Sequence, residues 1–248
     1  MKEKVYLYKL NKEKLLREES QLLGLLPEWR KEKVSKIKPE NSRIQSIVAG
    51  RLLDAAISRY LNIEISEVKW DFRENYVQDS NEKTIINFYE YVKRKDKIFY
   101  NISHSGDYVA VIVGEEPVGI DVENKDDKDF KVAKRFFTSN EVAYISEDQC
   151  RFRDVWTMKE AFLKCVGTGI NGSLGNFEGN LVKTIGEGSE VSEGVIVSAK
   201  DRHGNGYELQ GKEYHFVTAR IGDGDYSLTI CAENPKLTLD IEWVEVLL

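Results

Sequence analysis

The sequence is poor in the residues that build disulfide frameworks and transition-metal sites. Its 248 residues include only three histidines and three cysteines, and Cys150, Cys165 and Cys231 lie far apart with no C-x-x-C spacing. Neither a zinc site nor a disulfide-stapled fold is therefore expected. Because free cysteine packs as a small hydrophobe, we interpret these thiols as buried or incidental.

Long apolar runs are absent too. None approaches the roughly 20 residues that a membrane helix needs, and the N-terminal residues MKEKVYLYKL lack the apolar stretch of a signal peptide. With 41% hydrophobic residues, 31% charged residues and only four prolines, the composition is that of a folded globular protein. We expect a cytoplasmic protein that does not enter a membrane.

An overall excess of positive charge is also missing. The formal net charge is -6, which argues against a nucleic-acid-binding protein, since such proteins carry a basic balance on one face. One segment, residues 30–51, is nevertheless strongly basic. It contains only two acidic residues, against the basic residues Arg30, Lys31, Lys33, Lys36, Lys38, Arg43 and Arg51. Screening at physiological salt acts over about 8 Å, so a nearby anion would be attracted to this segment.

The length is compatible with two packed halves. In the first, residues 4–9 alternate as a strand, residues 12–26 and 42–61 show helical periodicity, and the second helix is expected to carry Arg43 and Arg51 on its polar face. Residues 85–91, 98–102 and 108–113 are rich in β-branched and aromatic side chains and indicate antiparallel strands. We expect the boundary between the halves near Gly114.

The second half is expected to begin with a strand at residues 118–122, followed by a charged loop at 124–129 and a helix at 130–137. The segment Thr138 to Glu141 fits the capping-box pattern, so a new helix should begin there. A further helix at 154–166 should end at Gly167 and Gly169. Strand-like runs at 194–198, 214–220 and 226–232 then predict an antiparallel sheet.

The segment GIDVE, residues 119–123, is the first candidate for chemistry. On a strand, Asp121 and Glu123 project from the same face, where two carboxylates repel each other unless water or a cation separates them. A solvated strand end would explain the pair. So would Mg²⁺, which binds to oxygen ligands and completes its shell with water and phosphate.

Two further segments add chemistry. In the helix WTMKEAFLK, residues 156–164, Trp156, Glu160 and Lys164 share one face; an ordinary exposed Glu-Lys pair would explain the charges but not the tryptophan. In NISHSG, residues 101–106, Ser103 and His104 can donate to a phosphate oxygen, although a surface histidine would also fit. A Ser-His-Asp hydrolase is disfavoured, because no G-x-S-x-G elbow is present.

In this order, NISHSG, GIDVE, RFFTSNE and WTMKEAFLK resemble the Sfp type of 4'-phosphopantetheinyl transferases. The resemblance implies an α+β fold of two similar halves related by a pseudo-twofold axis, residues 1–114 and 115–248, with coenzyme A bound between them. It implies transfer of the phosphopantetheine arm of coenzyme A to a serine of an acyl or peptidyl carrier protein, releasing 3',5'-ADP. Because one chain supplies both halves, a monomer is expected.

The resemblance also assigns roles to individual residues. It implies that Mg²⁺ is held by Asp121, Glu123 and Glu160, that Lys164 supports catalysis, and that the general base is Glu160 first and Glu141 second. The coenzyme A phosphates would be bound by Arg30, Lys33, Arg43, Ser103, His104 and Lys159. Arg43 matches less well, because Gln45 rather than arginine precedes Ser46.

One part of the family pattern is missing: the G-K-P loop that contacts adenine is not found upstream of NISHSG, where residues 75–97 stand instead. Two alternatives to the transferase therefore stay open. A silent relative would bind coenzyme A or carrier proteins without turnover, and a metal-dependent phosphohydrolase would release phosphopantetheine into water.

Overall fold

The computed structural model of the chain describes residues 2–68, 76–78, 83–85, 88–91, 96–124, 130–147, 151–167, 174, 177–185, 191–199, 212–245 and 247. The predictions for Cys150, Gly169, the loop after residue 124 and most of residues 75–97 lie outside these ranges. Within them, no helix is both long and apolar enough to cross a membrane.

The first half follows the predicted pattern. Its elements are β1 (Lys4–Lys9), α1 (Lys12–Gly24), α2 (Glu28–Ser35), α3 (Glu40–Leu61), the 3-10 turn η1 (Ile65–Glu67), β2 (Tyr76–Gln78), β3 (Lys83–Ile85), β4 (Phe88–Tyr91), β5 (Asp96–Ser105) and β6 (Tyr108–Gly114). Local signals set the helix ends: Asn11 accepts a hydrogen bond from Lys14 N–H as the N-cap of α1, and Asn62 takes the left-handed conformation after α3.

The second half contains β7 (Val118–Asn124), α4 (Phe130–Phe136), α5 (Ser139–Glu147), α6 (Arg151–Val166), β8 (Phe177–Ile185), β9 (Val191–Ala199), β10 (His215–Ile221), β11 (Tyr226–Ala232) and β12 (Ile241–Trp243). The predicted capping box is confirmed, because Thr138 N–H donates to Glu141 Oε2 at 2.9 Å and Glu141 N–H donates to Thr138 Oγ1 at 3.3 Å. Gly167, with φ 74°, follows α6 as predicted.

The two five-stranded sheets repeat one strand order. The first runs β12-β1-β6-β5-β4 and the second β7-β11-β10-β9-β8, so β1, β6, β5 and β4 correspond to β7, β11, β10 and β9. The predicted α+β fold is confirmed. The last strand crosses back: β12 pairs in parallel with β1, and Val244 N–H donates to Leu7 O at 2.9 Å.

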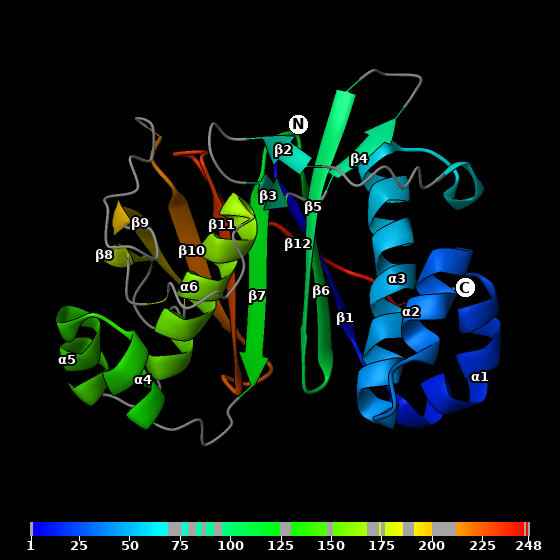
Figure 1. The fold of residues 1–248 in the computed structure, drawn as a ribbon, viewed down its shortest axis with the longest axis horizontal. Helices are drawn as coiled ribbons and strands as arrows, with labels where there is room; N and C mark the ends of the chain where they lie inside the picture. Colours follow the sequence, from blue (N-terminus) through cyan, green and yellow to red (C-terminus); the bar gives the residue numbers. More distant parts are fainter. Residues whose placement is uncertain are drawn as a thin grey trace.

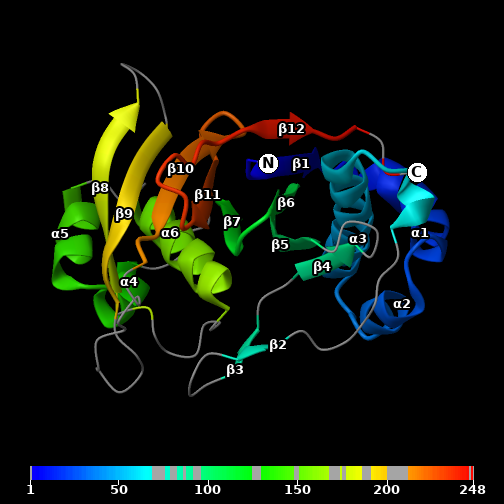
Figure 2. The ribbon, with the colours of Figure 1, turned by 90° about the horizontal axis from the view of Figure 1, so that it is seen from above.

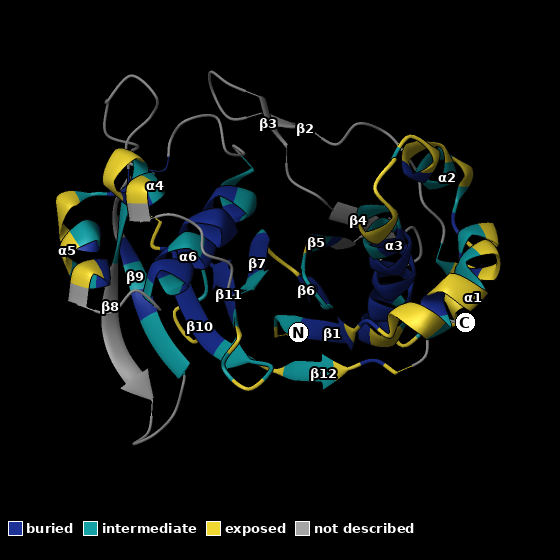
Figure 3. Ribbon diagram, turned by 90° about the horizontal axis from the view of Figure 1, so that it is seen from below, coloured by how far each residue is buried: buried dark blue, intermediate teal, exposed yellow. Residues whose placement is uncertain are grey.

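The helices lie on the outer sides of the two sheets (Figures 1 and 2). One core fills the space between α3 and the first sheet, a second lies between α6 and the second sheet, and a third joins the sheets through side chains such as Ile112, Ile120 and Ile230. The outward faces of α1, α2 and α5 are exposed, whereas α3 is buried along most of its length (Figure 3). The sheets thus meet through apolar side chains, which fixes how β5 and β7 lie together.

The polar face predicted for α3 is wrong at Arg51. This side chain is buried and donates to Asp54 Oδ2 at 2.8 Å and to Leu247 O at 3.1 Å. The physical reason is the returning C-terminal segment, whose residues Val244 and Leu247 pack in the core of the first half. Burial of Arg51 is compensated by its carboxylate and carbonyl partners.

Candidate functional site

The site is built where β5 of the first half lies beside β7 of the second. Alternate residues of β5 share a face, and three of them bond to β7. Asn101 Nδ2 donates to Val118 O at 3.3 Å, Ser103 Oγ accepts from Val122 N–H at 3.2 Å, and Ser105 Oγ accepts from Asn124 N–H at 3.2 Å. Side chains of the NISHSG segment therefore replace a backbone ladder between the two halves.

Three predicted site residues meet at Asp121. Ser103 Oγ donates to Asp121 Oδ1 at 2.7 Å, and the Lys164 ammonium donates to the same oxygen at 2.8 Å and to Ile120 O at 3.0 Å. Asp121 is buried, and among the described residues its second oxygen, Oδ2, has no hydrogen-bond partner. A buried carboxylate oxygen without a donor is costly, which points to a ligand that is bound during function.

The close approach of α6 to β7 depends on Gly119, whose role was not predicted from the sequence. A Cβ atom at this position would clash with the carbonyl oxygen of Ala161 on α6. Since only glycine lets the helix lie this close, Gly119 brings Lys164 within reach of Asp121. This glycine is the first residue of the GIDVE motif, so the sequence contained the information but not the reason for it.

The remaining predicted metal ligands flank Asp121. Glu160 lies one turn before Lys164 on α6 and is buried, while Glu123 lies on the same face of β7 as Asp121 and is half-buried. In the part of the chain that the structure describes, no three His, Cys, Asp or Glu side chains form a ready-made metal cluster. The donor set still fits Mg²⁺: all its donors are oxygens, Asp121 Oδ2 has no donor, and Mg²⁺ is commonly held by one or two carboxylates together with substrate phosphates.

Arg30 lies on the first-half side of the site. Its side chain crosses Gly50 of α3, where a Cβ atom would lie 2.6 Å from Arg30 Nε, and its guanidinium is 5.5 Å from the centre of the Trp29 ring. Among the described residues, the buried Nε–H has no hydrogen-bond acceptor. Burial lowers the pKa of Arg30, although a guanidinium stays charged. A desolvated cation with an unused donor suits an anion.

His104 projects from the face of β5 opposite to Ser103 and is exposed. Its pKa is lowered first by partial desolvation and then by the positive charge of Lys164, with a smaller effect from Arg30. The imidazole is therefore neutral near pH 7 in the absence of an anion, and a bound phosphate would favour its protonated form.

Lys33 and Arg43, two other predicted phosphate ligands, have different surroundings. Lys33 is exposed in the last turn of α2. Arg43 Nε donates to Glu19 Oε1 of α1 at 2.7 Å, so its guanidinium already has a carboxylate partner. Their contacts with coenzyme A stay predictions, and Arg43 would have to share its guanidinium with Glu19.

Lys159 and Glu141 form a separate buried pair inside the second half. The Lys159 ammonium lies 2.8 Å from Glu141 Oε1, donates to Leu174 O at 2.6 Å and to Phe177 O at 2.7 Å, and has no exposed surface. The carboxylate and the two carbonyl acceptors together favour the charged ammonium. Burial lowers the pKa of Lys159 and raises the pKa of Glu141, and the attraction between the partners opposes both shifts.

This geometry does not favour the roles predicted for the pair. The Lys159 ammonium is fully buried, already donates to two carbonyls and lies against Glu141 Oε1, while Glu141 Oε2 caps α5. A direct contact of Lys159 with coenzyme A, and general-base action by Glu141, remain untested predictions. In the structure the two residues tie α5 and the segment before β8 to α6.

Part of the chain is similar to one known protein family. Residues 117–231 match the family model described as the 4'-phosphopantetheinyl transferase superfamily. This segment runs from just before β7 almost to the end of β11 and contains Asp121, Glu160 and Lys164. The match therefore covers the part of the second half that holds the predicted carboxylates and Lys164.

Individual relatives agree with the predicted resemblance, which is confirmed. One is "4'-phosphopantetheinyl transferase Sfp" of Bacillus subtilis (strain 168), 30% identical over 150 residues, or 58% of this chain and 59% of that protein. Another is "4'-phosphopantetheinyl transferase psf-1" of Bacillus pumilus, 37% identical over 95 residues, or 36% of this chain and 41% of that protein. The "4'-phosphopantetheinyl transferase" of Bacillus subtilis is 29% identical over 158 residues, or 61% of this chain and 62% of that protein. The chain thus spans between 41% and 62% of the lengths of these relatives.

Proposed function

We propose that the protein is a magnesium-dependent 4'-phosphopantetheinyl transferase that moves the phosphopantetheine arm of coenzyme A to a serine of an acyl or peptidyl carrier protein, releasing 3',5'-ADP. The observation that carries the proposal is the convergence of Ser103 with Asp121 and Lys164, the last two of which lie in the segment that matches the superfamily. Residues 1–114 supply groups for the coenzyme A phosphates, and residues 115–248 supply the carboxylates and Lys164.

Asp121, Glu123 and Glu160 would hold Mg²⁺ together with the pyrophosphate of coenzyme A. When bound, the ion supplies Lewis-acid stabilisation of the charge on the phosphate oxygens. Ser103 orients the Asp121 carboxylate by donating to Oδ1, which leaves Oδ2 for a ligand. Lys164 adds a positive charge beside the same carboxylate.

The carrier serine must lose its proton as its oxygen attacks phosphorus, and the bond to the leaving 3',5'-ADP breaks. Glu160 is the proposed base, because it is a carboxylate on the same helix as Lys164 and one turn away from it. Burial of Glu160 excludes much of the water that would compete for its oxygens. The protein is further proposed to act in the cytoplasm as a monomer that binds neither nucleic acid nor membrane, with both halves of the site in one chain.

The first test is mass spectrometry of an apo carrier protein incubated with coenzyme A, Mg²⁺ and this chain. The carrier is expected to gain the mass of one phosphopantetheine, and the gain should disappear when Mg²⁺ is chelated. If several acyl and peptidyl carriers gain no mass although coenzyme A binds, the protein is a silent binding module. Free phosphopantetheine with an unmodified carrier would instead identify a phosphohydrolase.

Arg30 gives a second prediction. Replacing Arg30 by Met keeps an unbranched side chain over Gly50 but removes the buried donor, so KM for coenzyme A should rise about tenfold or more while kcat changes little. Lys33→Met, at an exposed position, should raise KM only a few-fold.

KM values for dephospho-coenzyme A, which lacks the 3'-phosphate, test whether Arg30 binds that phosphate. With this substrate, Arg30→Met and the parent protein should have similar KM values. An equally large rise in KM with both substrates would show that Arg30 does not bind the 3'-phosphate.

A further inference from the structure

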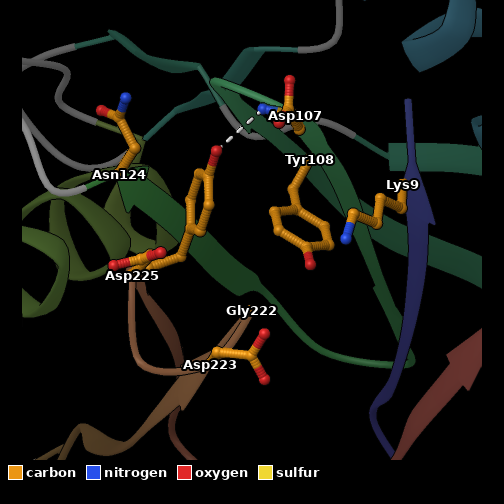
Figure 4. A pocket seen from close by; sticks show the side chains of 8 residues that line it. Lys9, Asp107, Tyr108, Asn124, Gly222, Asp223 and Asp225 are labelled. Carbon is orange, nitrogen blue, oxygen red and sulfur yellow. Dashed lines mark hydrogen bonds between the residues drawn. The ribbon is translucent and has the colours of Figure 1, made fainter. Parts of the chain in front are cut away.

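A pocket of about 390 Å³ lies between the two halves. One of its lining residues, Asn124, follows Glu123 in the chain, and its N–H donates to Ser105 Oγ at 3.2 Å. Its walls come from the end of β1, the turn between β5 and β6, the end of β7, and the turn between β10 and β11 (Figure 4). None of the residues proposed to bind Mg²⁺ or coenzyme A lines it. The roles proposed for those residues therefore do not explain the lining of this pocket.

The first observation that points to a ligand is the hydroxyl of Tyr108. This residue is only 3% exposed and lines the pocket, and Figure 4 shows its hydroxyl directed toward the side where Gly222 and Asp223 lie. Within the described ranges, no residue forms a hydrogen bond with this hydroxyl. The neighbouring Tyr226 hydroxyl, by contrast, accepts from Asp107 N–H at 3.1 Å. The hydroxyl is therefore the polar atom that Tyr108 presents to the pocket, and it is available to a ligand there.

The second observation is the charge of the walls. Asp107, Asp223 and Asp225 contribute three carboxylates, against the single ammonium of Lys9. Asp107 lies 4.0 Å from Lys12. The carboxylates of Asp223 and Asp225 form no ion pair within the described ranges, although the Arg153 guanidinium donates to the backbone carbonyls of Gly224 and Asp225. Asp223 adopts φ 58°, a left-handed conformation that aspartate tolerates better than most residues. The pocket is thus negatively charged.

The third observation is the aromatic wall. The Tyr108 and Tyr226 rings meet edge to face with their centres 4.7 Å apart, and the Lys9 ammonium lies 5.8 Å from the centre of the Tyr108 ring. The face of an aromatic ring attracts cations, most strongly where water is excluded. The chain thus already places one of its own ammonium groups near this ring.

We propose that this pocket binds a small organic cation that carries a primary ammonium or guanidinium group. The carboxylates of Asp223 and Asp225 would pair with the cation, the Tyr108 ring would face it, and the Tyr108 hydroxyl would accept one of its N–H donors. Because Lys9 and Tyr108 belong to the first half and Asp223 and Asp225 to the second, the ligand would also link the halves. The inference does not depend on the transferase proposal.

The test is isothermal titration calorimetry of the full chain with putrescine, using butane-1,4-diol as a neutral probe of the same length. Saturable binding of one putrescine per chain is expected, with no binding of the diol. Nα-acetyl-lysine amide, which mimics a side chain of a partner protein, separates the two sources of such a cation: binding tighter than that of putrescine would assign the site to a protein side chain. Absence of saturable binding by both cations would overturn the proposal.

Variants locate the site. The double change Asp223→Asn, Asp225→Asn should weaken putrescine binding about tenfold, since each exposed pair contributes modestly. Tyr108→Phe should weaken it about threefold. Lys9→Gln removes a like charge and should tighten binding, whereas an anion site would lose affinity. Glu116→Gln, an exposed change that removes one negative charge just beyond the far end of β6, is the control and should have no effect.

Folding is checked by circular dichroism melting of each variant. If Tyr108→Phe does not fold, the exposed Lys9→Gln change still decides the sign of the ligand charge. Weaker binding in Lys9→Gln, or equal binding in the Asp223→Asn, Asp225→Asn variant and the parent, would contradict the proposal.

Discussion

Replacing Glu160 by Gln is expected to reduce transfer to a carrier protein by roughly 10²- to 10⁴-fold, the range that a general base typically contributes. The change keeps the shape of a buried side chain on α6 but removes its charge and its ability to accept the serine proton. The rate of carrier modification by mass spectrometry, at saturating coenzyme A and Mg²⁺, measures the effect. Glu116→Gln, at an exposed position, is the matched control and should transfer at the parental rate.

Two readouts separate a catalytic loss from a folding defect. The thermal melt of Glu160→Gln should stay close to that of the parent, because one carboxylate oxygen is replaced by an amide of equal size. Turnover within tenfold of the parent would rule out the proposed role. Glu141→Gln then serves as the comparison for the second candidate base: if it abolishes transfer while Glu160→Gln does not, and both proteins are stable, the roles are reversed.

Local signals in the sequence predicted local structure well. The capping box at Thr138 and Glu141 involves residues three apart, so its two hydrogen bonds depend on little else. Helical and strand periodicities likewise predicted α3, α6 and β7, because the pattern of buried positions follows the geometry of each element.

Contacts between distant segments could not be predicted in this way. Arg51 looked like a surface residue of α3 because nothing near it in the sequence indicates that Leu247 returns to cover it. Ser103 was expected to contact phosphate, and the structure shows its hydroxyl bonded to Asp121, a residue of the other half. In both cases the partner is set by how the two halves pack.

In the candidate site, too, local geometry could be predicted from the sequence, whereas contacts between distant segments could not. Asp121 and Glu123 share a face of β7 because the strand period places them there, as predicted. The approach of Lys164 to Asp121 required Gly119 and the packing of α6, which the motif contains but does not explain. Burial of Lys159 required aromatic rings from separate segments: its ammonium lies 5.4 Å from the Phe137 ring centre and 4.3 Å from that of Phe177.

Replacing Lys159 by Met is expected to lower the free energy of unfolding by roughly 3–5 kcal/mol, the usual effect of breaking a buried ion pair from one side. Methionine fills a similar volume but leaves the Glu141 carboxylate buried without its cation and removes the donors to Leu174 O and Phe177 O. Urea denaturation followed by circular dichroism measures the loss. Lys236→Met, at an exposed position, should leave stability unchanged within about 0.5 kcal/mol.

A double-mutant cycle with Glu141→Gln separates the ion pair from other effects. The double variant should lose less stability than the sum of the two single changes, because removing the glutamate charge relieves the unpaired carboxylate that Lys159→Met leaves behind. Kinetics give the opposing test. If Lys159→Met is as stable as the parent but raises KM for coenzyme A, then Lys159 contacts the substrate directly and the buried pair is not its role. A stability loss with KM unchanged at a temperature where the variant is folded would instead show that Lys159 acts by holding α6, and with it Glu160 and Lys164, against the rest of the second half.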